Sequence, residues 1–410
     1  MATAAARPPE RDTSMSSGCR EAAAGPEHEQ PLDDGREARR SEQLNSGDVA
    51  EPQAKLRSME RLVRQAGAST FAELLQRRVL QLSHARVLPD AVGNLEALRE
   101  LYLPSSNQIA CLPASIGNLT SLQILHVGGN RLSTLPDTIG RLCSLRTLCL
   151  SENRLSELPE GFGELRNLQT LRLSSNCLTS LPASFGGCEA LETLQLHSNE
   201  LAGLPDSFCR LRSLRVLGLR SNRLEMLPAD FGQLLALESA ELSENQLTSL
   251  PDSICDLCAL RALYLHGNRL AALPEDFGNL CSLEAVHLSH NELEELPSGF
   301  GALSKLQSLH LHRNHLKALP ESFCALLSLQ VLYLQGNHLV ELPASFGELP
   351  ALRVLQLRGN RLRALPASFE RLQGLRNLEL DPQAELLRKV IQHRARAAQS
   401  LQQGLACCCR

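Results

Sequence analysis

The sequence predicts an α/β repeat, a solenoid whose short parallel strands form one concave β-sheet with helical caps at its ends. Three observations predict this fold. Asparagine recurs at a constant spacing of 23 residues, leucines hold fixed places around each asparagine, and a Leu-Pro step stands at one place in each period. A constant period of about 20–50 residues is the sequence signature of a repeat architecture. The asparagines are Asn107, Asn130, Asn153, Asn176, Asn199, Asn222, Asn245, Asn268, Asn291, Asn314, Asn337 and Asn360.

The unit around Asn176 shows how one period is expected to fold. Leu171 and Leu173 have the spacing of a strand with one buried face, so Arg172 between them points to the other face. The Asn176 side chain can bond backbone groups of its own turn and of the neighbouring turn. We therefore interpret the asparagines as a structural ladder. Pro182 fixes its own φ and turns the chain toward the convex side.

A phenylalanine column accompanies the asparagine ladder, and we expect its rings to stack as a spine. Glycine usually follows this column, yet Cys209, Cys255, Cys324 and Glu370 also occur there. A strictly left-handed position would not accept these residues easily, so the place requires small size more than handedness. The column consists of Phe162, Phe185, Phe208, Phe231, Phe277, Phe300, Phe323, Phe346 and Phe369, with Ile139 and Ile254 as substitutes.

The N-terminal part divides into a tail and a cap. Residues 1–54 contain almost no large apolar side chains, so they cannot offset the entropy of ordering, and we expect a disordered tail. In residues 55–79 apolar side chains such as Leu62 fall at helical spacing, and Thr70 or the serine before it can begin a second helix. These residues are predicted to be capping helices. The solenoid itself is predicted to span residues 80–381.

The C-terminal part begins where Gln383 replaces the ladder asparagine. Residues 382–403 are predicted to form an amphipathic helix that caps the solenoid; the alternative is a basic helix that lies on a membrane. Residues 404–410 form a Cys-rich tail. Three adjacent cysteines there, Cys407, Cys408 and Cys409, are candidates for lipidation, which would give a peripheral association with membranes.

Composition limits the functional classes. A formal charge of −4 gives no general attraction to nucleic acid. No apolar run approaches the roughly 20 residues that a membrane span needs, and the first residues lack the apolar segment of a signal peptide. The interior cysteines are scattered through the repeats instead of being gathered in flanking caps. We therefore expect a cytoplasmic protein with free thiols.

Variable residues on the concave face are where a solenoid of this type binds. Four of them, Tyr264, His287, His310 and Tyr333, fall on consecutive strands and predict an aromatic and imidazole patch that suits a protein partner. A merely solvated face and a metal site are the alternatives. A metal site is disfavoured because no carboxylate or cysteine stands at the same turns. The candidate partner-binding residues are Arg172, Arg220, Glu241, Tyr264, His266, His287, His290, His310, His312, Tyr333, Gln335 and Arg358.

Protonation of the adjacent histidines is expected to change partner binding below about pH 6.5. Nothing argues for catalysis or for a cofactor, because the chain has no phosphate loop, nucleophile elbow, kinase motif set or His-Glu-x-x-His. The pair Cys255-x-x-Cys258 is joined only by Cys281 and lacks a fourth zinc ligand. We interpret these cysteines as small buried apolar residues. An enzymatic hypothesis would rest only on the histidines.

The repeated unit over residues 80–381 resembles the intracellular, Ras-group class of leucine-rich repeat proteins. That class includes Shoc/Sur-type scaffolds, Scribble and Erbin. The resemblance implies a horseshoe-shaped leucine-rich repeat solenoid and a non-catalytic adaptor in intracellular signalling. It also implies that the concave sheet holds protein partners, such as a Ras-like small GTPase or a phosphatase. The alternative function is a substrate-recruiting subunit of a ligase or phosphatase complex, with a cap helix as the docking element.

Overall fold

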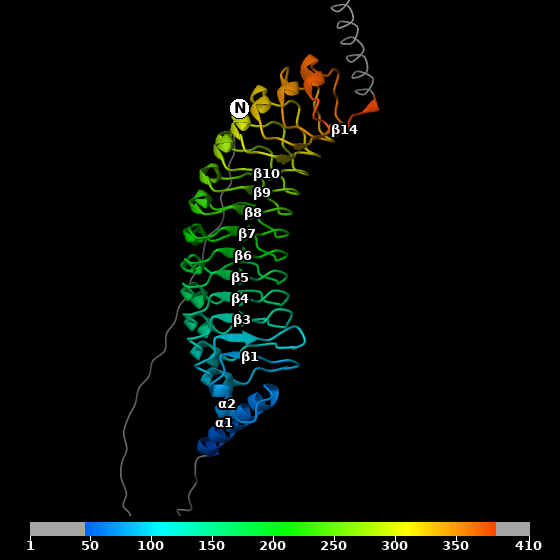
Figure 1. Ribbon diagram of the computed structural model, residues 1–410. Helices are drawn as coiled ribbons and strands as arrows, with labels where there is room; N and C mark the ends of the chain where they lie inside the picture. Colours follow the sequence, from blue (N-terminus) through cyan, green and yellow to red (C-terminus); the bar gives the residue numbers. More distant parts are fainter. Residues whose placement is uncertain (1–45, 383–410) are drawn as a thin grey trace, which may run out of the picture. The chain divides into compact units, whose positions relative to one another are not determined.

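The computed structural model of the protein describes residues 46–382. Within this range, fourteen strands form one parallel sheet in strict chain order, and the strands stack along the coil in Figure 1. The predicted parallel solenoid is therefore confirmed. The strands are β1 Val79–Gln81, β2 Glu100–Tyr102, β3 Ile124–His126, β4 Thr147–Cys149, β5 Thr170–Arg172, β6 Thr193–Gln195, β7 Val216–Gly218, β8 Ser239–Glu241, β9 Ala262–Tyr264, β10 Ala285–His287, β11 Ser308–His310, β12 Val331–Tyr333, β13 Val354–Gln356 and β14 Asn377–Glu379.

Short 3₁₀ helices return the chain on the side opposite the sheet, and they stack along the left margin of Figure 1. A proline with φ between −54° and −69° precedes most of them, as at Pro205 before η6, which confirms the turning role of the Leu-Pro step. The 3₁₀ helices are η1 Asp90–Asn94, η2 Ala114–Asn118, η3 Asp137–Arg141, η4 Glu160–Glu164, η5 Phe185–Gly187, η6 Asp206–Arg210, η7 Phe231–Gln233, η8 Asp252–Asp256, η9 Glu275–Asn279, η10 Phe300–Ala302, η11 Glu321–Ala325, η12 Phe346–Glu348 and η13 Ala367–Arg371.

Strand register follows the sequence period. Leu125 of β3 pairs with Leu148 of β4, one 23-residue step along the chain. The first two steps differ, since Leu80 pairs with Leu101 and Leu101 pairs with Leu125. The uniform register beyond β3 places residues of equal position in the repeat side by side on the sheet.

The asparagines form the predicted ladder. Asn199 accepts a hydrogen bond from the Leu178 N–H at 3.1 Å through its Oδ1 atom. Its Nδ2 donates to the Leu173 carbonyl of the preceding turn and to the Leu196 carbonyl of its own turn, both at 3.0 Å. The same bonds recur from Asn130 to Asn360, so each of these asparagines satisfies buried backbone groups of two turns.

The phenylalanine column explains the curvature. Its rings stack nearly parallel with centroids 5.9–6.4 Å apart, in one run from Phe162 to Phe208 and another from Phe277 to Phe369. Phe231, between the runs, is also fully buried. Hydrogen-bonded strands lie only about 4.8 Å apart. Each turn is therefore wider at the 3₁₀ side than at the strand side, which puts the sheet on the concave face.

The glycine after each phenylalanine of the column has an ordinary negative φ. Glycine is favoured at this place because it is small, as the following distances show. A Cβ atom at Gly186 would lie 2.0 Å from the Ser207 carbonyl oxygen of the next turn, and one at Gly301 would lie 1.8 Å from that of Ser322. No real Cβ approaches an oxygen so closely. The prediction that size matters more than handedness at this place is confirmed.

The N-terminal cap consists of α1 Ser46–Gln65 and α2 Phe71–Leu75. Leu62 and Leu74 are fully buried in the common core, and the Thr70 hydroxyl accepts from the Glu73 N–H at 3.3 Å to begin α2. One predicted boundary needs correction. The helix includes residues 46–54, which the sequence analysis assigned to the tail. An ion pair from Glu51 to Lys55 at 2.8 Å, one helical turn apart, bridges the expected boundary.

At the other end, β14 completes the sheet, and the Asp381 carboxylate accepts hydrogen bonds from the Gly359 N–H at 2.9 and 3.0 Å and from the Asn360 N–H at 3.2 Å. This carboxylate serves backbone groups of the preceding turn, a contact that the sequence analysis did not predict. The expected tail up to residue 45, the C-terminal helix from residue 383 onward and the cysteines Cys407, Cys408 and Cys409 lie outside the described residues.

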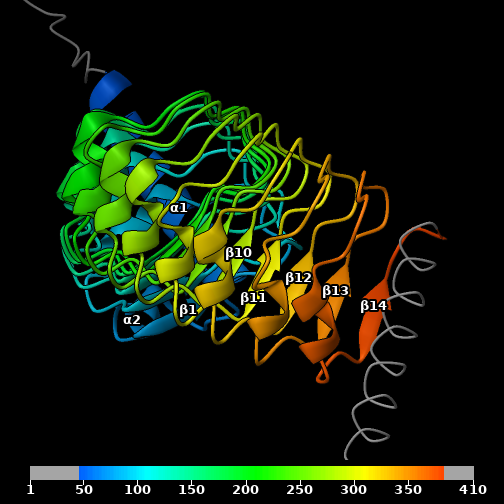
Figure 2. The same ribbon diagram turned by 90° about the horizontal axis from the view of Figure 1, so that it is seen from above.

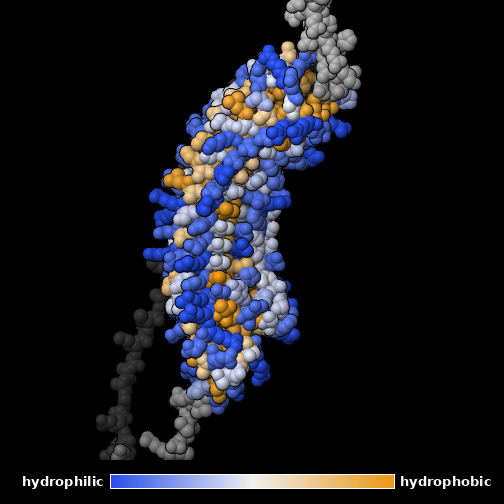
Figure 3. All heavy atoms as spheres, in the orientation of Figure 1, coloured by the Kyte–Doolittle hydropathy of each residue, from blue (hydrophilic) through white to orange (hydrophobic). Residues whose placement is uncertain are grey.

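The apolar side chains are gathered inside the coil. In Figure 3 the visible face is largely hydrophilic, with small separate apolar areas. Among the described residues, no helix combines the length and the apolar character needed to cross a bilayer. Figure 2 looks along the coil and shows the 3₁₀ helices gathered on one side of the stacked strands.

Candidate functional site

The third residue of every strand forms one column across the concave sheet. The register pairs Glu241 with Tyr264, Tyr264 with His287, His287 with His310 and His310 with Tyr333. Beyond them the column continues from Tyr333 to Gln356 and Glu379. The sequence analysis read this column from the period alone, and the structure brings its members together in that order.

Four members of the column, Tyr264, His287, His310 and Tyr333, touch ring to ring and are called the aromatic strip below. Tyr264 meets His287 edge-on at a centroid distance of 4.8 Å. His287 stacks on His310 at 3.8 Å with the rings within 9° of parallel. Tyr333 then meets His310 at 4.6 Å and 67°. All four side chains are half-buried, so the strip is a continuous, partly dry surface over β9–β12.

A second row of imidazoles lies beside the aromatic strip. The ring centroid of His312 lies 6.2 Å from that of His310 and 6.3 Å from that of Tyr333. The ring centroids of His290 and His312 lie 5.5 Å apart. His266 is half-buried on the same side. The Nδ1 atom of His312 and the Oε1 atom of Gln335 are buried without a hydrogen-bond partner within the described part of the chain.

Burial favours the neutral form of four histidines of this surface, His266, His287, His310 and His312. Burial lowers the pKa of His310 to about 4, with the neighbouring His287, His312 and His266 adding to the shift. Burial is also the main cause that lowers the pKa of His287, His266 and His312. Two neutral rings can stack at 3.8 Å without charge repulsion. At pH 7 the surface therefore offers aromatic faces and neutral donors and acceptors.

The charged candidates surround the strip at different distances. Glu241 is the immediate neighbour of Tyr264, and Arg358 is exposed in the turn after β13. Arg220 is bonded to Glu244 at 2.7 Å, so its charge is already compensated. Arg172 is exposed on β5, four strands from Tyr264, and does not belong to the same surface.

One structural requirement was missed in the sequence. The residue before each ladder asparagine from Asn130 to Asn360 adopts a left-handed backbone, with φ between 54° and 57° at non-glycine residues and between 70° and 74° at glycines. The signal was the glycine that recurs in this place at Gly129, Gly267, Gly336 and Gly359. His290 and Arg313 occupy such positions, and both residues are exposed.

A further contact joins a concave residue just after β6 to one on β7. A Cβ atom at Gly218 would lie 2.2 Å from Nε2 of His197, so the His197 ring covers this glycine. The Nδ1 atom of His197 is buried and has no hydrogen-bond partner within the described residues. The sequence alone did not predict this contact. His197 lies two residues after the third strand residue of its own unit, and its ring fills the space left by the missing side chain of Gly218.

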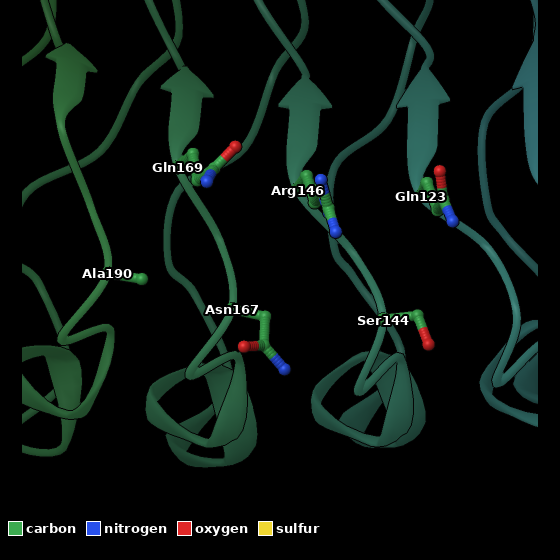
Figure 4. Close-up of a pocket in the computed structure, with 6 residues that line it drawn as sticks. All are labelled: Gln123, Ser144, Arg146, Asn167, Gln169 and Ala190. Atoms are coloured by element: carbon green, nitrogen blue, oxygen red, sulfur yellow. The ribbon is translucent and has the colours of Figure 1, made fainter.

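A polar depression lies where the strands begin (Figure 4). It has a volume of about 310 Å³ and is lined by Gln123, Arg146 and Gln169 just before the strands, and by Ser144, Asn167 and Ala190 from the loops after the 3₁₀ helices. It is open to solvent and holds no acid–base pair. Within residues 46–382 no group of three histidine, cysteine or acidic side chains converges as metal ligands would. Neither feature supports a catalytic centre.

Comparisons with known proteins agree with the repeat geometry. Families described as "Leucine rich repeat" and "Leucine-rich repeat region" match residues 143–201, 166–224 and 277–339, and residues 56–152 and 204–289. A solved leucine-rich repeat protein of Leptospira interrogans is 36% identical with a TM-score of 0.65, over 76% of this chain and 86% of that one. The chain is a leucine-rich repeat protein. Among curated protein sequences, none matches it.

Two further solved structures similar to this leucine-rich repeat protein contain ligands. The plant peptide hormone receptor RGFR1 in complex with RGF2 is 27% identical with a TM-score of 0.58, over 75% of this chain and 59% of that one. The structure of PEPR1 with AtPEP1 is 28% identical with a TM-score of 0.68, over 82% of this chain and 52% of that one. The leucine-rich repeat fold is generally a non-catalytic fold that binds proteins. Membership of the intracellular Ras-group class stays a prediction.

Proposed function

We propose that this leucine-rich repeat protein is a non-catalytic scaffold in intracellular signalling that holds a protein partner on its concave sheet. The observation that carries the proposal is the aromatic strip, four half-buried rings in unbroken contact across β9–β12. A Ras-like small GTPase or a phosphatase is the partner class that the resemblance to the Ras-group repeats suggests.

The chemistry of the strip favours a protein ligand. Aromatic side chains combine apolar faces with polar edges, and such residues contribute most of the binding energy at protein interfaces. The tyrosine hydroxyls of the strip can bond a backbone amide or a polar side chain of the partner. Glu241 lies at one end of the strip and Arg358 beyond the other, so charged residues of the partner would set its direction along the sheet.

Similar structures give independent support. RGFR1 and PEPR1 are solved with RGF2 and AtPEP1, and both structures share the repeat fold with this chain. We extend protein binding from those structures to this protein as part of the proposal. The intracellular location rests on the scattered cysteines, and the ten described ones are free thiols. Membrane tethering through the three C-terminal cysteines is a further part of the proposal.

The test is proximity labelling in cells with the full chain and a variant in which Tyr264, His287, His310 and Tyr333 are replaced by alanine. A matched control replaces His315 and His338, a second stacked imidazole pair with a centroid distance of 5.4 Å that lies outside the aromatic strip. We expect the strip variant to lose partners that wild type and control label equally. Far-UV circular dichroism verifies that both variants fold.

Equal labelling by all three proteins would show that the aromatic strip is not the binding surface. Loss of the same partners by the control and by the strip variant would show a general effect on folding instead of a specific site. A purified partner identified in this way should then bind wild type in vitro and bind the strip variant at least tenfold more weakly.

A further inference from the structure

A column of exposed residues runs along the outside of the 3₁₀ helices, four places after each residue of the phenylalanine column. Two neighbours in it are cysteines: Cys258 follows Ile254, and Cys281 follows Phe277. Both thiols are free and exposed. The interpretation of these cysteines as buried apolar residues therefore holds for Cys255 and is wrong for Cys258 and Cys281. Most other residues of this column are not cysteines, so adjacent thiols occur here once within the described repeats.

The two cysteines leave the backbone in the same way. The Cys258 N–H donates to the Asp256 carbonyl at 2.8 Å, and the Cys281 N–H donates to the Asn279 carbonyl at 2.7 Å. The leucines before them have almost equal dihedral angles, φ −74° and ψ 66° at Leu257 and φ −70° and ψ 62° at Leu280. The two Cα–Cβ bonds are therefore close to parallel on adjacent turns.

The distance between the two turns that carry the cysteines follows from the strands that come after them and from the phenylalanine column that comes before them. Three residues later, the Glu284 N–H donates to the Arg261 carbonyl at 2.8 Å, which is the spacing of paired strands. Four residues earlier lie Ile254 and Phe277 of the phenylalanine column, and in the next turn the rings of this column, Phe277 and Phe300, are spaced at 5.9 Å. The Cα atoms of Cys258 and Cys281 thus lie between about 4.8 and 6 Å apart. Disulfides form across Cα distances of about 4.4–6.8 Å.

A third cysteine of the same column shows the reach of a thiol there. The Cys143 Sγ atom lies 3.7 Å from the Thr120 carbonyl oxygen, and Thr120 is the equivalent residue one turn earlier. A sulfur at this place can therefore reach its counterpart on the preceding turn. For Cys281 that counterpart is Cys258.

We propose that Cys258 and Cys281 form an oxidation site at which a hydroperoxide converts the two thiols into a disulfide that joins adjacent turns of the solenoid. One thiolate attacks the peroxide, and the O–O bond breaks to give a sulfenic acid and the first water or alcohol. The second thiol attacks that sulfur, the S–S bond forms, and the sulfenic oxygen leaves as water. The two sulfurs lose two electrons in all, and the peroxide gains them.

The nearer cysteine in sequence, Cys255, is not the partner. It is a buried residue of the 3₁₀ helix η8, and burial together with nearby aspartates raises the pKa of its thiol to about 11. A thiol of this kind supplies little thiolate at neutral pH. The Cys-x-x-Cys spacing that attracts attention in the sequence is therefore not the reactive pair.

The test uses the folded full chain at low concentration, reduced, freed of reductant, treated with one equivalent of hydrogen peroxide and then alkylated. Monomer is isolated and digested with trypsin without reduction. Cleavage after Arg223, Arg261, Arg269 and Lys305 separates residues 224–261 from residues 270–305. We expect these two peptides to be joined and to be lighter than their sum by two hydrogen atoms.

Variants assign the bond. Cys258→Ser and Cys281→Ser should each abolish the joined peptide, and Cys255→Ser and Cys143→Ser should leave it. Alkylation of Cys258 and Cys281 to the same extent as Cys143 after peroxide treatment would overturn the proposal. A bond between Cys255 and Cys258, or one found only in dimers, would overturn it as well.

Discussion

Replacement of one ladder asparagine tests the mechanical account of the fold most directly. In Asn222→Ala the side chain that bridges two turns is removed. The Oδ1 atom of Asn222 accepts from the Leu201 N–H at 3.1 Å, and Nδ2 donates to the Leu196 and Leu219 carbonyls at 2.9 Å each. The residue is 7% exposed, so water cannot replace these bonds without opening the turn.

The three bonds are not equally costly to lose. The Leu196 and Leu219 carbonyls keep a second donor, since Asn199 donates to the first and Asn245 to the second, each at 3.0 Å. Asn222 is the only described partner of the Leu201 N–H. Leaving that donor buried and unpaired costs about 1–3 kcal/mol, and the weakened acceptors add about 1 kcal/mol. We therefore expect a loss of about 2–4 kcal/mol in the free energy of unfolding.

The assay is urea unfolding followed by circular dichroism, with the midpoint and the m-value fitted for each protein. Gln195→Ala is the matched control, because it removes an amide of similar size from the half-exposed concave face. The control should shift the midpoint little. A change below about 0.5 kcal/mol in Asn222→Ala, which is the scatter of ordinary surface substitutions, would refute the ladder as a source of stability. A lower m-value would instead indicate that the coil unfolds in parts.

Two further predictions concern the concave face and the convex turns. Because burial lowers the pKa of folded His310 to about 4 from an unfolded value near 6.5, the unfolded chain binds the proton more tightly. The contribution of His310 to stability is complete above about pH 6.5 and is lost as the pH drops toward 4. The urea midpoint should therefore fall less between these pH values in His310→Gln than in wild type. An equal fall in both proteins would contradict the lowered pKa of His310. Gly301→Ala places a Cβ 1.8 Å from the Ser322 carbonyl oxygen and should destabilise by about 1–3 kcal/mol, as overpacking does. Gly203→Ala, which meets nothing within 4 Å, should have a near-neutral midpoint, and equal effects in the two variants would contradict the size argument.

The low pKa of His310 also changes an expectation about binding. The sequence analysis placed the pH response of the histidines below about pH 6.5, the range of a free imidazole. Burial and mutual proximity move protonation of the buried rings to lower pH. Partner binding through the aromatic strip should therefore persist at mildly acidic pH and weaken only when these rings become charged.

The repeat could be read from the sequence because its rules are local and recur at a constant spacing. The inward places of Leu171 and Leu173, the bonding role of Asn176 and the small residue after Phe185 each follow from the strand period, hydrogen-bond chemistry or steric fit within one or two turns. The left-handed position before the asparagines from Asn130 onward was missed because glycine marks it in only some turns. Serine, glutamate, histidine and arginine adopt it in the others under the constraint of neighbouring turns.

The sequence by itself determined the solenoid, its parallel sheet and the order of side chains across the concave face, because a constant period converts position in the chain into position in space. Only the tertiary structure decided which of those side chains act together. It joined Tyr264, His287, His310 and Tyr333 ring to ring, paired Arg220 with Glu244 and left Arg172 apart. Ring orientation, burial and pairing depend on neighbours from three or four turns at once, and the period of a single unit carries no information about them.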